Sequence, residues 1–275
     1  MADKEKINVN KTIKLVSDMI IYGIIIYVFL VLFGKIYINK ESLIKLLNSF
    51  VGGTNWFIII YCILYLLIPY INKLLTNISK KEYRILLLIS LVFFCIWPTL
   101  IPNKTTVSDS GLGIINFIIL YMLGGYIKKY FKVEKYSIIN YLLIYIFISI
   151  VTFVYSLVPS RAFCYNSIFN IFGAVSLFLI FCKIRDFNSN IIDKLATNTF
   201  GIYIIHANVF ISEFLWSDIL KCQYFYESKI YIIHAICSVA LVYIVSLCIN
   251  ILIQNIFMKK IYKIIDKRNI KINIE

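Results

Sequence analysis

Long apolar runs recur along the whole chain and constrain its fold more than any other feature. Of the 275 residues, 61% are hydrophobic and only 15% are charged. A helix needs about 20 consecutive apolar residues to cross a bilayer, and it satisfies all of its backbone hydrogen-bonding groups internally. We therefore predict an all-α fold, a polytopic transmembrane helix bundle with about eight spans. The expected ranges are 15–38, 55–71, 84–102, 111–127, 137–158, 164–182, 199–219 and 229–257.

The polar segments between these runs are short. The longest hold about 10–20 residues, which is too few for an independent hydrophobic core. We therefore expect a single membrane domain over residues 1–275, with the lipid bilayer as its surroundings and no separate soluble domain.

The net charge is +14, and the basic residues are distributed along the chain in a pattern that needs no nucleic-acid ligand to explain it. If the N-terminus is cytoplasmic, the expected inside segments carry most of the 28 Lys and Arg residues, for example Lys11, Lys80 and Lys260. The expected outside segments carry few, such as Lys40 and Arg161. This alternation is the positive-inside bias of membrane proteins. It predicts a multi-pass protein of the cell membrane with both termini in the cytoplasm, and no nucleic-acid partner.

The segment TNTFGIYIIHAN at 197–208 contains His206, one of only two histidines. An ionisable side chain within a span is a functional-site hypothesis by default. On a continuous helix over 199–219, at about 100° per residue, mostly polar side chains share one stripe. The stripe consists of Thr199, Tyr203, His206, Phe210, Glu213 and Ser217. Such a stripe should face the bundle interior or a water-filled cavity, so His206, Tyr203 and Glu213 are the candidate catalytic residues. The alternative, that His206 only bonds a neighbouring helix, stays open.

Other polar residues are weaker candidates. His234 is expected to be structural, and Arg161 is either a solvated loop charge or a ligand for phosphate or sugar. Asn116 and Asn166 fit cavity residues or plain interhelical contacts equally well. Because the two histidines are far apart and no carboxylates cluster, no metal site is predicted.

Four segments in order carry a resemblance to a known family. TNTFGIYIIH at 197–206 resembles the signature near the C-terminus of the integral-membrane acyltransferase 3 family. NWFIIIYCILYLLIPYINKLL at 55–75 and SGLGIINFIILYMLGGYIKKY at 110–130 resemble two of its other spans. ISEFLW at 211–216 follows the signature as it does in that family. The resemblance covers nearly the whole chain.

The resemblance implies an O-acyltransferase reaction. The family transfers an acyl group, usually acetyl, from a cytosolic acyl-CoA to a hydroxyl of a cell-envelope glycan or its lipid-linked precursor. Acyl-CoA (acetyl-CoA) would then be a co-substrate, with no cofactor bound, and a neutral His206 would suit a general base. Basic loops at 80–84 and 128–135 would attract the CoA phosphates, although positive-inside charge explains them equally well.

The chain also departs from the family pattern. Family members normally begin with two further spans, the first of which carries an Arg and a His that are essential for transfer. Here no Arg precedes Arg84 and no His precedes His206. We therefore expect the chain as given to lack the first two family spans and the principal catalytic His. Whether it is active or inactive stays open, as do two alternatives: a lipid-linked glycan transporter or flippase, and a non-catalytic membrane partner.

Overall fold

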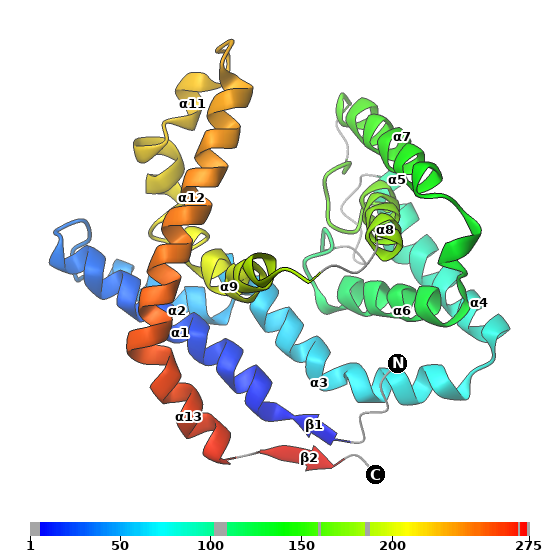
Figure 1. Ribbon diagram of the computed structural model, residues 1–275, viewed down its shortest axis with the longest axis horizontal. Helices are drawn as coiled ribbons and strands as arrows, with labels where there is room; N and C mark the ends of the chain where they lie inside the picture. Colours follow the sequence, from blue (N-terminus) through cyan, green and yellow to red (C-terminus); the bar gives the residue numbers. More distant parts are fainter. Residues whose placement is uncertain (1–5, 102–108, 159–160, 185–187, 269, 274–275) are drawn as a thin grey trace. The chain divides into compact units, whose positions relative to one another are not determined.

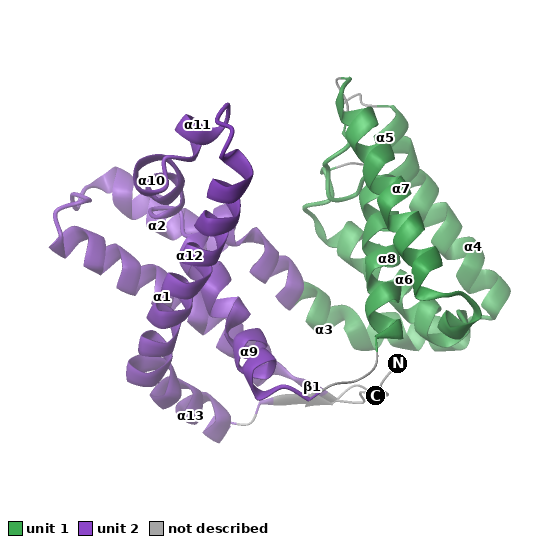
Figure 2. Ribbon diagram, turned by 45° about the horizontal axis from the view of Figure 1, so that its top comes forward, with its two compact units in different colours: residues 1–5, 63–187 green, residues 6–62, 188–275 purple. Residues whose placement is uncertain are grey.

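Helices make up almost all of the structure, as the all-α prediction requires. The computed structural model describes residues 6–101, 109–158, 161–184, 188–268 and 270–273. Its chain forms two compact units, coloured separately in Figure 2: residues 63–187 and residues 6–62 with 188–275. The division into two compact units does not test the expectation of a single membrane domain, which stays a prediction.

The first unit consists of the later turns of α3 and the helices that follow it. After α3 (Trp56–Asn77) come α4 (Lys80–Leu91), the π-helix η2 (Val92–Ile96), α5 (Trp97–Leu100) and α6 (Ile114–Tyr130). The 3-10 turn η3 (Val133–Lys135), α7 (Ile138–Ser156) and α8 (Ile168–Lys183) complete it. The Tyr83 hydroxyl donates to the Met122 carbonyl at 2.6 Å, which joins α4 to α6.

The second unit joins the two ends of the chain. Its N-terminal part is β1 (Lys6–Asn8), α1 (Val9–Leu32), α2 (Lys40–Val51), the 3-10 turn η1 (Gly53–Asn55) and the start of α3. Its C-terminal part begins with α9 (Asn190–His206), α10 (Ser212–Phe214), the π-helix η4 (Leu215–Ile219) and α11 (Cys222–Phe225). It ends with α12 (Tyr231–Ile253), the π-helix η5 (Gln254–Met258), α13 (Lys259–Arg268) and β2 (Lys271–Asn273). Strands β1 and β2 pair antiparallel, as Figure 1 shows, and this small sheet was not expected from the sequence.

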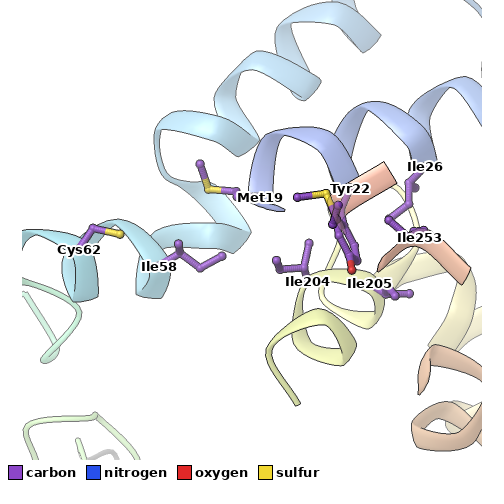
Figure 3. Close-up of a cluster of buried hydrophobic side chains, with 9 residues drawn as sticks. Met19, Tyr22, Ile26, Ile58, Cys62, Ile204, Ile205 and Ile253 are labelled. Carbon is purple, nitrogen blue, oxygen red and sulfur yellow. The ribbon is translucent and has the colours of Figure 1, made fainter. Parts of the chain in front are cut away.

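The core of the second unit lies where α1, α3, α9, α12 and η5 meet. Figure 3 shows its apolar side chains pointing toward one another from these helices. They are Met19, Tyr22, Ile26, Ile58, Cys62, Ile204, Ile205, Ile253 and Met258. This packing fixes α9 beside α1 and α12, so the segment with the candidate histidine has a defined setting within its unit.

Five helical segments are long and apolar enough to cross a membrane: Val9–Leu32, Lys40–Asn77, Lys80–Leu100, Ile138–Ser156 and Tyr231–Arg268. They coincide with five of the expected spans, which supports a multi-pass membrane protein. The expected spans at 111–127 and 164–182 are present as α6 and α8, but these helices have 17 and 16 residues. At 1.5 Å per residue each is about 25 Å long, against about 30 Å of hydrocarbon. The cytoplasmic placement of both termini remains a prediction.

The expected span at 199–219 is wrong as a continuous helix. Helix α9 begins earlier, at Asn190, and ends at His206; the residues after it form a turn, the short α10 and the π-helix η4. The apolar count over this region is high, but local hydrogen bonding interrupts the helix, as described below.

Candidate active site

Helix α9 carries the candidate histidine in its last turn. The helix begins after Ser189, whose side-chain oxygen accepts from the Ile192 N–H at 3.4 Å and caps the helix. It ends at His206, so that residue lies at the carbonyl end of the helix rather than in the middle of a span. The carbonyl end of a helix is a favourable place for positive charge.

Asn208 explains why α9 stops. Its side-chain Oδ1 accepts from the Phe210 N–H at 2.9 Å, and its carbonyl accepts from the N–H groups of Ile211 and Ser212 at 3.0 and 2.9 Å. Asn side chains compete for backbone groups in this way and favour turns over helix interiors. With only 2% of Asn208 exposed, the turn is part of the packed structure.

The turn divides the predicted polar stripe. Thr199, Tyr203 and His206 share one face of α9, but Phe210 and Glu213 lie beyond the turn. One straight helix therefore does not align all of these side chains, and this part of the sequence interpretation is wrong.

The ring of His206 has a defined orientation. Its Nδ1 lies 2.7 Å from the Ile202 carbonyl oxygen, one turn earlier on the same helix. Because a carbonyl oxygen only accepts, Nδ1 carries the proton and donates it. In the neutral imidazole, Nε2 then keeps its lone pair. Nε2 has no hydrogen-bond partner among the described residues, and the side chain is half-buried. It is therefore oriented as a proton acceptor.

Tyr203 lies beside this histidine and ties it to the start of α3. The two rings meet edge to face with centroids 6.2 Å apart. The Tyr203 hydroxyl donates to the Thr54 carbonyl in η1 at 2.9 Å, and its ring also meets Phe57 edge to face at 6.1 Å. Its hydroxyl proton is thus engaged by the backbone, which suits a residue that positions His206.

Two buried oxygen atoms close to that hydrogen bond have no hydrogen-bond partner among the described residues. They are Thr54 Oγ1 and Asn55 Oδ1, on neighbouring residues of η1. The amide nitrogen of Asn55, Nδ2, donates to the Ser49 carbonyl at 2.9 Å. This bond fixes the side chain, while its Oδ1 acceptor stays unsatisfied within the described residues. Buried polar atoms are nearly always satisfied, so unsatisfied ones are notable beside a candidate site.

Glu213 and Phe210 have separate surroundings. Glu213 lies in α10, is exposed, and has no hydrogen bond or ion pair in the described part of the chain. Phe210 packs against Tyr27 of α1 with ring centroids 5.4 Å apart, and Lys45 of α2 lies 5.3 Å above its ring. The structure therefore brings Tyr203 and His206 together, and Glu213 forms no hydrogen bond with either.

A buried hydrogen-bond network joins α9 to α1 and α12, and the sequence did not predict it. Asn250 of α12 accepts from the Tyr22 hydroxyl at 2.6 Å and donates through Nδ2 to Asn198 Oδ1 on α9. Gln254 of η5 donates to the Tyr22 oxygen at 3.0 Å. A Cβ on Gly201 would overlap Asn250 Oδ1, so any larger residue at this position would displace the Asn250 amide from its hydrogen bonds. Asn198 and Gly201 of the signature are therefore structural.

A buried carboxylate in α1 was also missed. Asp18 is 5% exposed and accepts the Tyr262 hydroxyl, with both carboxylate oxygens 2.6 Å from it. Lys14 lies 5.1 Å above the Tyr262 ring and forms a 2.8 Å ion pair with Asp266. The signal in the sequence was an isolated acidic residue inside the first apolar run.

The weaker candidates have protein partners. His234 stacks on Phe225 with centroids 3.9 Å apart and donates from Nε2 to the Leu220 carbonyl at 2.9 Å, which accords with its expected structural role. Arg161 donates to Ser110 Oγ at 2.7 Å, and Asn166 donates to the Phe94 carbonyl at 2.8 Å.

Asn116 donates to the Gly111 carbonyl at 3.0 Å, but its buried Oδ1 has no hydrogen-bond partner in the part of the chain that the structure describes. Among the residues that the structure describes, no three His, Cys, Asp or Glu side chains come together as a metal site would require.

A family model of an acyltransferase domain, that of the acyltransferase 3 family, matches residues 3–254. No curated protein and no solved structure matches the chain.

Proposed function

Because the chain belongs to the acyltransferase 3 family, we propose that it is a membrane O-acyltransferase with His206 as its general base. It moves an acyl group, acetyl in the simplest case, from acyl-CoA to a hydroxyl of a surface polysaccharide or its lipid-linked precursor. The five long apolar helical segments support the membrane setting.

The orientation of the His206 ring carries this proposal. A general base needs a lone pair aimed at the substrate and a proton held firmly on the other nitrogen. The 2.7 Å contact between Nδ1 and the Ile202 carbonyl meets the second requirement, and Nε2, which has no hydrogen-bond partner among the described residues, is available for the first. A histidine that only tied two helices together would have its outward nitrogen bonded to the neighbouring helix.

The reaction then follows a balanced course. Nε2 takes the proton of the acceptor hydroxyl while that oxygen attacks the thioester carbonyl. The resulting tetrahedral intermediate collapses, the C–S bond breaks, and the CoA thiolate receives the proton from the imidazolium. The products are the ester and free CoA thiol. The position of His206 at the carbonyl end of α9 favours the positive charge that the ring gains in the first step.

Two further residues have roles in this proposal. Tyr203 holds the imidazole through the edge-to-face contact and the bond to the Thr54 carbonyl, so it is a positioning residue. Glu213 is exposed and unbonded in the described part, which leaves its carboxylate free to accept hydrogen bonds from the acceptor sugar. With both termini cytoplasmic, the donor comes from the cytosol.

The decisive experiment measures acyl transfer by the purified full chain in lipid nanodiscs. Radiolabelled acetyl-CoA is supplied with membrane extracts that contain lipid-linked and polymeric glycans, and label in the glycan fraction is counted. His206→Gln keeps a polar side chain of similar size but removes the base, and general-base removal typically costs about 100-fold or more in rate. His234→Gln is the matched control, because that histidine already donates to the Leu220 carbonyl.

The outcomes separate the proposal from its rivals. We expect wild type and His234→Gln to transfer label and His206→Gln to lose transfer. Equal transfer by wild type and His206→Gln would refute the role of His206. Movement of lipid-linked glycan across the bilayer without acyl-CoA would favour a flippase, and absence of transfer until a second membrane protein is added would favour a non-catalytic partner.

A further inference from the structure

A groove of about 610 Å³ runs between α6 and α8 of the first unit, and none of the candidate catalytic residues lines it. One side is formed by α6, with Leu120, Gly124 and Lys128, and the other by Phe178 and Cys182 of α8. Most of its lining is apolar, and one end of it is cationic.

The groove follows from the residue spacing on both helices. Residues four apart on a helix lie on the same face, so Leu120, Gly124 and Lys128 form one row, as do Phe178 and Cys182. Gly124 leaves the middle of the row bare, and a Cβ there would meet no atom within 4 Å. An extended apolar chain can therefore lie against the backbone of α6.

Two contacts fix the segment beside the Lys128 end of the groove. Lys183 pairs with Glu134 at 3.0 Å, and the Tyr141 hydroxyl donates to the Val133 carbonyl at 3.0 Å, so η3 is fixed against α7 and α8. These bonds leave Glu134 occupied. Lys128 has no acidic or aromatic partner in the described part of the chain, and it lines the groove.

From this arrangement we propose that the α6–α8 groove binds an anionic phospholipid, with an acyl chain along Gly124 and the phosphate at Lys128. Basic pockets between membrane helices bind anionic headgroups, and the apolar row continues from the charge in the direction that an acyl chain requires. The inference depends on the membrane setting and not on the proposed acyl transfer.

A second groove in the same unit provides a natural comparison. It has a volume of about 400 Å³, lies between α7 and α8, and is lined by Ser149, Thr152, Asn170 and Gly173 among others, with no Lys or Arg. A Cβ on Gly173 would lie 3.8 Å from Ile148 Cγ2, which is ordinary contact. This groove lacks the charge that selects an anionic lipid.

The test counts lipids that remain bound to the full chain by native mass spectrometry. The protein is released from nanodiscs of equal phosphatidylglycerol and phosphatidylcholine. We expect wild type to retain more phosphatidylglycerol than phosphatidylcholine. In Lys128→Gln the ratio of the two bound lipids should fall about five-fold, the factor for one lysine near an anionic surface. Lys260→Gln on α13, also an exposed lysine, removes the same net charge elsewhere and should leave the preference unchanged.

Filling the groove tests the apolar half of the proposal. Gly124→Leu should lower phosphatidylglycerol occupancy several-fold, whereas Gly173→Leu in the uncharged groove should not. Equal retention of both lipids by wild type would overturn the proposal, as would equal effects of Lys128→Gln and Lys260→Gln. Displacement of the lipid by palmitoyl-CoA at equal concentration would instead assign the groove to the acyl donor. Because lipid retention is measured without acyl transfer, failure here leaves the proposed reaction untouched.

Discussion

Replacing Gly201 by alanine tests the packing that fixes α9, the helix that contains the family signature (the signature helix). The added Cβ would overlap the Asn250 side-chain oxygen, so the Asn250 amide must move. When it moves, Asn250 loses its bonds with Tyr22 and with Asn198.

The expected cost is the sum of three effects. Interhelical hydrogen bonds in membranes contribute about 0.6 kcal/mol on average and about 1.7 at most, so losing two costs about 1–3 kcal/mol. Overpacking adds about 1–3 kcal/mol. The higher helix propensity of alanine offsets about 1 kcal/mol of this loss in the free energy of unfolding. The free energy of unfolding should therefore fall by about 3 kcal/mol, within about 1–5.

Unfolding is measured by titrating the purified chain in mixed micelles with a denaturing detergent and following helix content by circular dichroism. Gly124→Ala is the matched control, since its Cβ meets no atom within 4 Å and only the propensity effect remains. That control should be stabilised by up to about 1 kcal/mol, the opposite sign.

A double variant tests the cause. In an Asn250→Ala background the overlap is removed, so Gly201→Ala should cost much less there, with a coupling of at least about 1 kcal/mol. The reasoning fails if Gly201→Ala is as stable as Gly124→Ala. It also fails if the cost of Gly201→Ala is the same in both backgrounds.

Two further predictions concern the residues around the candidate base. Tyr203→Phe removes the donation to the Thr54 carbonyl but keeps the ring contacts, so kcat should fall about 3- to 10-fold, equivalent to about 1 kcal/mol, with KM unchanged. Loss of unfolding free energy with unchanged kcat would contradict the positioning role. Asn208→Ala removes the acceptor of the Phe210 N–H, so α9 should extend past His206 and amide exchange over 207–211 should slow. Unchanged exchange there would mean that other contacts end the helix.

The long apolar helices were predictable because their signal is strong and local. Helices α1 and α12 each hold a long and strongly apolar run, so length and composition identify them. The segment 199–219 also contains many apolar residues, but it was predicted wrongly as one continuous helix. One side chain, Asn208, bonds the backbone two residues ahead and ends the helix, and an average over 20 residues does not detect that.

The buried hydrogen-bond network around Asn250 could not be predicted from the sequence for a different reason. Tyr22 and Asn250 are separated by 228 positions, and nothing in either local pattern indicates that they meet. Each alone is a polar residue in an apolar run, which marks it as unusual but names no partner. Asp18 and Tyr262 are a second such pair, 244 positions apart. For His206, the sequence predicted a role but not the ring orientation, which depends on the backbone carbonyl of Ile202.

The signature helix meets two separate demands, and this determines how its variants must be interpreted. Asn198 and Gly201 hold α9 against α12, so their replacement lowers the unfolding free energy and reduces any activity only as a consequence. Within the described part of the chain, the one hydrogen bond of His206 runs from Nδ1 to its own helix, so removing its ring should cost little stability. A variant that loses acyl transfer while its unfolding curve is unchanged therefore identifies a chemical role. Within the signature, we expect that combination at His206 and not at Asn198 or Gly201.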